Sequence, residues 1–394
     1  MVILTLHNFY QQPGGEDAVF RAETALLKER GHEVVHYTLH NDAVNAMSSP
    51  ALARATFWNR RAYRDIRSLI RSRRPSLVHV HNTLPLISPS AYYAAKHEGV
   101  AVVQSLHNYR LFCPNGLFFR DDRVCMDCSD KLAPWPSVVH GCYRGSRPAT
   151  AVVASMLSAH RALGTWHDAI DTYIALTSFS RQVFVDCGLP GERVVVKPNF
   201  MHPDPGVSSG KRELVLFAGR LSEEKGISTL LTALEKLGGR VPACIVGDGP
   251  LAGRVEQAVS ALPGLTWLGH RPPDEVCELI GSASLLVVPS RWFENFPRVL
   301  VESFARGTPV IASELGALAE IVNDGENGFV VPPGDADALA DRIERALSRP
   351  DRLAELGANA RVEFERKYSA EPGYRNLMEI YEHAQARAAL PATG

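Results

Sequence analysis

Long apolar runs and an excess of one charge are both missing from this sequence. The longest apolar stretch, ATAVVASMLSA from Ala149, is about half the length that spans a bilayer, so no transmembrane helix is expected. The formal net charge is −1 over 394 residues, which gives no general attraction to nucleic acid. The opening MVILTLHNFY has no basic flank and is typical of a first strand, not of a signal peptide. We therefore expect a soluble, cytoplasmic protein with no nucleic-acid partner.

Cysteine is scarce except in one segment. Four of the seven cysteines share the spacing C-x11-C-x2-C-x13-C: Cys113, Cys125, Cys128 and Cys142. Because thiols stay reduced in the cytosol, this pattern favours metal ligands or free thiols over disulfides. Four thiolates suit tetrahedral Zn²⁺, and His140 could replace one of them. We expect a structural zinc loop without a catalytic role, and four free thiols are the alternative.

The length of the chain and the order of its segments predict two α/β domains. A single core rarely extends over 394 residues. Short β-branched runs such as VILTLH and SLVHVHN alternate with helical patterns, the first at about 16–30, which predicts parallel sheets with helices on both faces. The pattern restarts at KRELVLFAGRL after a polar stretch, 199–210. We place the domains at 1–198 and 199–369, with a cysteine-rich insertion, 113–142, in the first.

Polar residues follow several of the predicted strands. They are His7-Asn8, His81-Asn82, His107-Asn108, Gly219-Arg220, Gly247-Asp248-Gly249 and the run 290–294. Ligands of open parallel sheets bind beyond the carboxyl ends of the strands. If the two sheets face each other, these residues line one interdomain cleft, which is the usual location of a ligand pocket.

Two short motifs in the second half are typical of phosphate-binding loops. In FAGRLSEEKG, Arg220 and Lys225 precede a helix start near Gly226, where free backbone N–H groups favour an anion such as a diphosphate. A solvated turn, with both cations paired to neighbouring glutamates, is the alternative. In IVGDGPL, Gly247 and Gly249 permit close approach of the backbone, although many α/β turns have this composition.

The segment SRWFENFPRVLVESFARGTPVIAS contains two glutamates in an otherwise apolar stretch. Pro297 fits a first helical turn and Gly307 a helix end, so we expect a helix from Phe296 to Arg306. Glu294 then precedes the helix, and Glu302 lies within it. These carboxylates could accept hydrogen bonds from sugar and ribose hydroxyls, with a phosphate on the free amides between them. Exposure of both side chains to solvent is the alternative.

Taken together, these segments resemble a known family. FAGRLSEEKG, VGDGPL, WFENFPRVLVESFARGTPVIAS and IVNDGENGFVVPPGD, in this order, are similar to the carboxyl-terminal domain of the retaining glycosyltransferases of family four, the group 1 glycosyltransferases. The resemblance implies the α/β fold called GT-B, with two facing Rossmann-like domains and an interdomain cleft. It also implies a last helix, at about 370–394, that crosses back to the first domain. The implied reaction moves a sugar from a nucleotide donor to an acceptor hydroxyl with retention of configuration.

The resemblance also assigns roles to individual residues. It implies that Arg220 and Lys225 bind the donor diphosphate. It places Glu294 and His107 at the donor sugar and Glu302 at the ribose. These are the catalytic candidates His107, Arg220, Lys225 and Glu294, and the donor-binding candidates Gly14, Gly15, Gly219, Gly247, Gly249, Asn295, Phe296, Pro297, Arg298, Val299 and Glu302. Many members have glycine in place of Pro297, which offers no N–H to the donor. His7 and His81 are weaker candidates for the acceptor side.

A basic stretch lies in the first half. Between Arg54 and Arg74 there are eight arginines and one acid, Asp65. Apolar residues recur there at helical spacing, so we expect a helix over 54–74 with a solvated basic face. The alternative is contact with anionic lipid headgroups at the inner face of a membrane, with an acceptor held on a lipid carrier.

These patterns favour a glycosyltransferase of polysaccharide or glycoconjugate biosynthesis. UDP is favoured over GDP as the donor nucleotide on frequency alone, and the acceptor could be a glycan, a lipid-linked sugar or a small molecule. No aspartate–x–aspartate element occurs at a strand end, so we expect no divalent cation in catalysis. The alternatives are another GT-B enzyme, such as a nucleotide-sugar epimerase or a phosphorylase, and a non-catalytic protein that binds nucleotide sugar or glycan.

Overall fold

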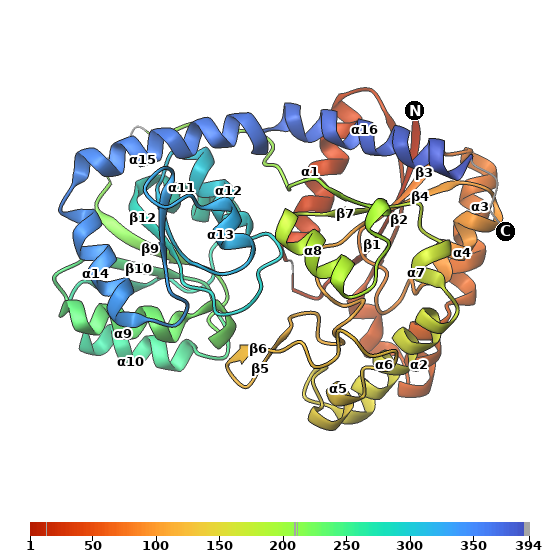
Figure 1. The fold of residues 1–394 in the computed structure, drawn as a ribbon, viewed down its shortest axis with the longest axis horizontal. Helices are drawn as coiled ribbons and strands as arrows, with labels where there is room; N and C mark the ends of the chain where they lie inside the picture. Colours follow the sequence, from red (N-terminus) through yellow and green to blue (C-terminus); the bar gives the residue numbers. More distant parts are fainter. Residues whose placement is uncertain (13, 209, 211, 390–394) are drawn as a thin grey trace. The chain divides into compact units, whose positions relative to one another are not determined.

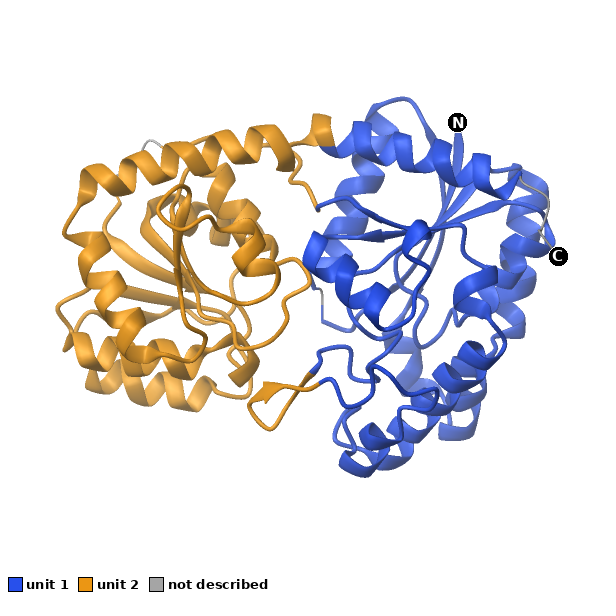
Figure 2. Cartoon of the chain, in the orientation of Figure 1, with its two compact units in different colours: residues 1–118, 126–198, 373–394 blue, residues 119–125, 199–372 orange. Residues whose placement is uncertain are grey.

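The chain forms two compact units in a computed structural model that describes residues 1–12, 14–208, 210 and 212–389 (Figures 1 and 2). Unit 1 and unit 2 are defined by their segments: 1–118, 126–198 and 373–394 for unit 1, and 119–125 and 199–372 for unit 2. The second segment of unit 1 ends at Pro198, immediately before the polar stretch. Residues 119–125 group with unit 2, although the sequence analysis placed them in an insertion of the first domain.

Unit 1 contains a parallel six-stranded sheet with the order β2-β1-β3-β4-β7-β8. Every residue of β3 and β4 is buried, as expected for a sheet with helices on both faces. The strands are β1 Val2–Phe9, β2 Glu33–His40, β3 Leu77–Val80, β4 Ala101–Ser105, β7 Thr172–Ala175 and β8 Val194–Val196. The sequence pattern predicts the first four of these strands but not β7 and β8, which are four and three residues long.

Helices of unit 1 fill the connections between these strands. They are α1 Gly15–Glu29, α2 Ser49–Phe57, α3 Arg60–Arg73, α4 Ser90–His97, α5 Trp135–His140, α6 Arg147–Ala162, α7 Thr165–Asp168 and α8 Ser178–Asp186. The predicted single helix 54–74 is wrong, because the chain breaks between α2 and α3. There the side chain of Asn59 accepts hydrogen bonds from the backbone N–H groups of Arg61 and Ala62 and starts a new helix.

Unit 2 repeats the architecture with the strand order β11-β10-β9-β12-β13-β14, also fully parallel. The strands are β9 Leu214–Ala218, β10 Ala243–Val246, β11 Leu265–Trp267, β12 Ala283–Val288, β13 Val310–Ser313 and β14 Gly328–Val331. The helices are α9 Ile227–Leu237, α10 Ala252–Ala261, α11 Pro273–Ser282, α12 Arg298–Ala305, α13 Ala317–Ile321, α14 Ala336–Leu347 and α15 Pro350–Glu363. Figure 1 shows α9, α10 and α14 on one face of this sheet and α11 and α12 on the other.

Two further elements link segments that are distant in sequence. A small antiparallel hairpin, β5 Phe119–Arg120 and β6 Arg123–Val124, belongs to unit 2, where Asp122 accepts a hydrogen bond from Arg291 through its backbone oxygen. The last helix, α16 Ala370–Ala388, begins in unit 2 and continues in unit 1, where Leu377 and Tyr381 are fully buried.

Each sheet has a point where the order of the strands reverses. In unit 1 this switch point lies between β1 and β3, and in unit 2 it lies between β9 and β12. The loops that follow such a pair of strands leave in opposite directions, which opens a binding position at the carboxyl edge of the sheet. The sequence candidates are concentrated in these loops.

Candidate functional site

The switch point of unit 2 brings two of the predicted residues into contact. Lys225, at the end of a 3₁₀ turn after β9, places Nζ 2.6 Å from Oε1 of Glu294 in the loop after β12. The hydroxyl of Ser290 donates to the same oxygen at 2.8 Å. The side chain of Glu294 is only 5% exposed, whereas that of Lys225 is 28% exposed. The carboxylate is therefore fixed from below, and the ammonium reaches the surface of the unit.

Glycines allow the loops of unit 2 to pack closely on one another. A Cβ at Gly226 would lie 1.8 Å from the backbone oxygen of Pro289, and one at Gly247 would lie 1.8 Å from that of Gly219. Gly247 also has φ +134°, which side chains rarely adopt. A Cβ at Gly249 would lie 2.5 Å from the oxygen of Leu221. Close backbone packing thus accounts for Gly247 and Gly249, and their predicted contact with the donor stays a prediction.

Helix α12 begins later than predicted. It runs from Arg298 to Ala305, and Pro297 is the residue before it, with an extended ψ of 111°. Proline fits this position because it needs no N–H there, but it is not in the first helical turn. Within the helix, Glu302 lies four positions after Arg298 and accepts a hydrogen bond from its Nη2 at 2.8 Å. Burial raises the pKa of Glu302, and the nearby Arg298 opposes that rise.

Other predicted donor-binding residues of unit 2 differ in exposure. Asn295 and Phe296 are buried, and the ring of Phe296 packs against Tyr368 with centroids 5.9 Å apart. The side chain of Phe296 therefore belongs to the core, which leaves only its backbone for a ligand. Val299 is half-buried. Arg220 is exposed, and no carboxylate in the described part of the chain pairs with it.

The first loop of unit 1 contains the glycines Gly14 and Gly15, both exposed at the start of α1. A Cβ at Gly14 would meet no atom within 4 Å, so packing does not require glycine there. The backbone N–H of Gly14 donates to Oδ2 of Asp17 at 3.1 Å, and this acid also bonds to the buried His7 through Oδ1 at 2.7 Å. Gly247 is explained by close backbone packing, but Gly14 is not. Close approach of a ligand is therefore an explanation for glycine at position 14.

His107 follows β4 and lies against His81, which follows the neighbouring strand β3. Nε2 of His107 is 3.1 Å from Nδ1 of His81, and the rings stack with centroids 5.3 Å apart. Burial lowers the pKa of His107 to about 3 and that of His81 well below its usual range. Both imidazoles are therefore neutral near pH 7.

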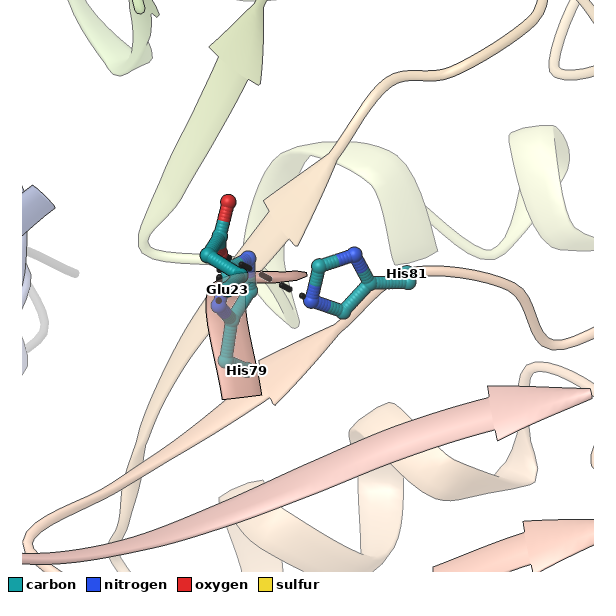
Figure 3. Close-up of side chains that lie close together, drawn as sticks. All are labelled: Glu23, His79 and His81. Carbon is teal, nitrogen blue, oxygen red and sulfur yellow. Dashed lines mark ion pairs between the residues drawn. The ribbon is translucent and has the colours of Figure 1, made fainter. Parts of the chain in front are cut away.

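These two histidines are joined by three buried residues that the sequence pattern did not predict to act with them. We call Glu23, His79, His81, His107 and Lys197 the histidine network. Nζ of Lys197 donates to Oε2 of Glu23 at 2.9 Å, and Oε1 of Glu23 faces Nδ1 of His79 at 3.3 Å (Figure 3 draws Glu23, His79 and His81). Burial alone would raise the pKa of Glu23, and the charge of Lys197 is the main cause that lowers it below its ordinary value. The HVH pattern of β3 was the available signal, because alternate residues of a strand share a face.

Glu23, His79 and His81 are the group in the described residues whose ligand atoms come close enough for a metal ion. Their partners argue against one. Lys197 already neutralises Glu23, while Tyr381 and Ser105 occupy both nitrogens of His79 at 2.8 and 2.9 Å. An ion would have to displace these contacts beside a fixed positive charge. We therefore interpret the group as a hydrogen-bonded part of the core and not as a metal site.

Glu16 is a second acid that the sequence analysis did not single out for chemistry. Its Oε2 accepts hydrogen bonds from the hydroxyl of Tyr10 at 2.9 Å and from the side chain of Asn108 at 3.3 Å. Its Oε1 is buried without a partner among the described residues. Burial raises the pKa of Glu16 to about 7, although the Tyr10 hydrogen bond and the charge of Arg110 lower it.

Among the described residues no disulfide joins the four clustered cysteines, and no three of them meet the spacing of a metal site. Sγ of Cys113 donates to Oδ1 of Asn115 at 2.9 Å, and burial raises the pKa of this thiol. Cys125 belongs to unit 2, whereas Cys113, Cys128 and Cys142 belong to unit 1. The zinc loop stays a prediction.

Two family profiles match consecutive parts of the chain. The profile described as "Glycosyltransferase Family 4" matches residues 13–204, and the one described as "Glycosyl transferases group 1" matches residues 202–363.

Curated proteins of similar sequence include two transferases. A phosphatidyl-myo-inositol mannosyltransferase of Mycobacterium leprae is 34% identical over 231 residues, which is 56% of this chain and 61% of that protein. An alpha-D-kanosaminyltransferase of Streptomyces kanamyceticus is 30% identical over 176 residues, or 43% of this chain and 45% of that protein. The chain spans about half the length of the curated relatives it matches.

Solved structures with the same fold cover almost the whole chain. HepE of Anabaena in complex with UDP has a TM-score of 0.67 at 19% identity, over 97% of this chain and 100% of that one. A sucrose-phosphate synthase from Thermosynechococcus elongatus has a TM-score of 0.67 at 18% identity, over 98% and 100%.

Proposed function

The chain belongs to the group 1 glycosyltransferases and has their GT-B fold, and from this premise we propose that it transfers a sugar from a nucleoside diphosphate to an acceptor hydroxyl. The observation that carries the proposal is the contact of Lys225 with Glu294 at the switch point of unit 2. It joins a cation suited to phosphate and a carboxylate suited to sugar hydroxyls at the edge of the sheet where ligands bind.

When it binds, the donor breaks the ion pair between Lys225 and Glu294 and interacts with both residues. When the diphosphate arrives, Lys225 turns its ammonium from Glu294 to a phosphate oxygen, and the exposed Arg220 adds a second charge. Glu294, still held by Ser290, then accepts hydrogen bonds from the sugar. The first free amides of α12 add partial positive charge, with one amide fewer than a glycine at Pro297 would give.

Glu302 binds the ribose of the donor. Its pairing with Arg298 leaves one oxygen of the carboxylate for the two ribose hydroxyls. Because the family reaction retains configuration, the nucleoside diphosphate departs and the acceptor attacks from the same face, with a donor phosphate oxygen as the base. Lys225 and Arg220 stabilise the charge on the leaving group, so no divalent cation is required.

We favour UDP over GDP as the donor nucleotide. HepE of Anabaena, which shares the fold, has been solved with UDP and with UDP-glucose. The acceptor is a glycan, a lipid-linked sugar or a small molecule, within polysaccharide or glycoconjugate biosynthesis. None of the helices in the described part of the chain combines the length and apolar character needed to cross a bilayer.

A lipid-linked acceptor would place the basic side of α3 near a membrane. Arg67 and Arg71 both pair with Glu98, at 2.5 and 3.0 Å, so other arginines of the stretch must supply the attraction to anionic headgroups. Co-sedimentation with phosphatidylglycerol vesicles at low and high salt tests this contact. Absence of binding at low salt would remove it.

Direct assay of the purified protein with UDP- and GDP-hexoses tests the function. Thermal shift selects the nucleotide, and ¹H NMR of the product reports the anomeric configuration. We expect transfer with retention. Donor turnover without an acceptor would indicate an epimerase, and a requirement for inorganic phosphate without nucleotide would indicate a phosphorylase. Binding without any turnover would contradict an enzymatic function.

A further inference from the structure

Glu23 presents a buried carboxylate oxygen to two imidazoles. No donor in the described part of the chain makes a hydrogen bond to Oε1. The nitrogens that face it are Nδ1 of His79 at 3.3 Å and Nε2 of His81 at 3.8 Å (Figure 3). An ionised carboxylate can only accept hydrogen bonds. A nitrogen that faces it is therefore more stable when it carries a proton than when it presents a lone pair. Oε1 therefore selects the proton on Nε2 of His81.

This selection passes from His81 to His107. A neutral imidazole has one N–H and one lone pair, so a proton on Nε2 of His81 leaves its Nδ1 as an acceptor. Nδ1 lies 3.1 Å from Nε2 of His107, which must then donate. The lone pair of His107 is consequently on Nδ1, and no residue in the described part of the chain bonds to that atom.

We propose that Glu23 and His81 are positioning residues that set the tautomer of His107, so that Nδ1 of His107 is presented as a hydrogen-bond acceptor to a hydroxyl group of the donor sugar. The catalytic part of this role rests on the proposed function, whereas the tautomer itself does not. A fixed tautomer means that the acceptor atom is ready before the donor binds.

The same network includes or contacts residues near two of the points where the chain passes from one unit to the other. Lys197, which holds the charge on Glu23, directly precedes Pro198 at the end of a segment of unit 1. Tyr381, on α16, bonds to Nδ1 of His79 at 2.8 Å. Lys197 and Glu23 are at most 3% exposed, so neither charge can turn to solvent. These contacts keep Oε1 in place, which is the condition for a single tautomer.

Histidine-selective ¹⁵N labelling and long-range ¹H–¹⁵N correlation spectra of the full chain test the tautomers. His107→Gln and His81→Gln assign the signals. We expect both residues in the Nε2–H form in the unmodified protein. In Glu23→Gln the ammonium of Lys197 can only donate, so the amide oxygen faces Lys197 and the NH₂ group faces His81. The Nδ1–H form is therefore expected at both residues. A pure Nδ1–H form of His107 in the unmodified protein would overturn the proposal, and so would unchanged spectra in Glu23→Gln.

Kinetics on the same variants test the catalytic role. Glu23→Gln should lower kcat about 10- to 100-fold, as for other groups that orient a reacting residue, with little change in KM for the donor. Because this change removes the negative charge that faces the buried ammonium of Lys197, Glu23→Gln combined with Lys197→Met should give the same loss of kcat with better folding. Glu98→Gln, which removes a paired acid elsewhere in unit 1, should change neither the spectra nor kcat.

The two readouts fail independently. Spectra that follow the prediction in a protein without transferase activity would sink the proposed function and keep the tautomer assignment. An active enzyme whose kcat is the same with Glu23 and with Gln at position 23 would refute the positioning role.

Discussion

Nζ of Lys225 lies 2.6 Å from Oε1 of Glu294, although 69 positions separate the two residues in the chain. The contact exists because β9 and β12 are neighbours at the switch point of the unit 2 sheet. The donor is expected to replace this contact, because its diphosphate would bind Lys225 and its sugar would bind Glu294.

Replacing Lys225 with methionine should lower transfer activity about 100-fold or more, because charge on the departing diphosphate loses a fixed cation. It should also lower the free energy of unfolding by about 1–3 kcal/mol, since Glu294 is left buried with only Ser290 as a partner. The rise in Tm on adding UDP should be much smaller. The matched control is Lys236→Met, because Lys236 pairs with Asp337 at the same 2.6 Å on the surface of unit 2. Equal losses in the two variants would contradict a role for Lys225 in binding the donor.

Glu302 should distinguish ribose from deoxyribose. The unmodified protein should bind UDP about tenfold more tightly than 2′-deoxy-UDP, which is about 1.4 kcal/mol for one good hydrogen bond. Glu302→Gln should lose most of that preference, measured by isothermal titration calorimetry. Asp341→Asn is the control, because Arg345 pairs with Asp341 four positions apart on α14, where both side chains are exposed. A preference that survives in Glu302→Gln would place the ribose elsewhere.

Glu16 should make stability depend on pH between about 4.5 and 7. Its pKa is raised in the folded chain to about 7 from an ordinary 4.5, so the folded protein holds the proton more tightly than the unfolded one. The resulting stabilisation is complete below pH 4.5 and disappears as the pH rises through 7. Glu16→Gln keeps the group neutral, so it should match the unmodified protein at pH 4.5 and exceed its stability by about 1–3 kcal/mol at pH 8. Urea unfolding at several pH values measures this. The exposed Glu33→Gln is the control and should show no such divergence from the unmodified protein. Parallel stability curves for Glu16→Gln and the unmodified protein would refute the assignment.

Glycine positions in the two units should respond differently to alanine. Gly247→Ala should cost more than about 2 kcal/mol, since its Cβ would collide with the backbone oxygen of Gly219 at a φ that alanine avoids. Gly14→Ala should change stability by less than about 1 kcal/mol, because nothing lies within 4 Å of the added Cβ. It should nevertheless raise KM for the donor if the first loop approaches it. Thermal unfolding and donor kinetics on both variants decide the matter, and a normal KM in Gly14→Ala would remove that loop from the donor site.

Metal analysis decides the zinc loop. Protein purified without chelator should contain close to one zinc per chain if the cysteines act as ligands, and Cys125→Ser with Cys128→Ser should release it. In that case the thiols must move together from their positions in the structure, where Cys113 bonds to Asn115. Zinc well below one equivalent would leave four free thiols.

The sequence predicted the fold well because its signals are local. Buried strands such as β9 and β12 are nearly continuous apolar runs, and strict alternation with helices leaves few topologies. Runs of three or four residues differ little from the apolar segments of helices or loops, so β7, β8 and β14 were missed, whereas the equally short β3, β10, β11 and β13 were predicted. The break at Asn59 was missed because the apolar spacing continues across it.

The site was predicted less completely than the fold. Lys225, Glu294 and Glu302 could be named one by one, but a periodic pattern contains no information on which side chains meet. Within the histidine network, His81 and His107 were named as candidates, but the pair of Glu23 and Lys197 could not be predicted because these residues are 174 positions apart. Gly247 was assigned to the ligand because its close contact with Gly219 exists only in the folded chain.

The route of the chain through its two units has a consequence for synthesis. Everything that belongs to unit 2 has been translated by residue 372, whereas unit 1 still lacks α16, whose Tyr381 completes the surroundings of His79. On the ribosome, the unit that begins first is therefore the last to be finished. Part of the core of nascent unit 1, including the side of His79 that Tyr381 covers, therefore stays uncovered while the second unit is translated.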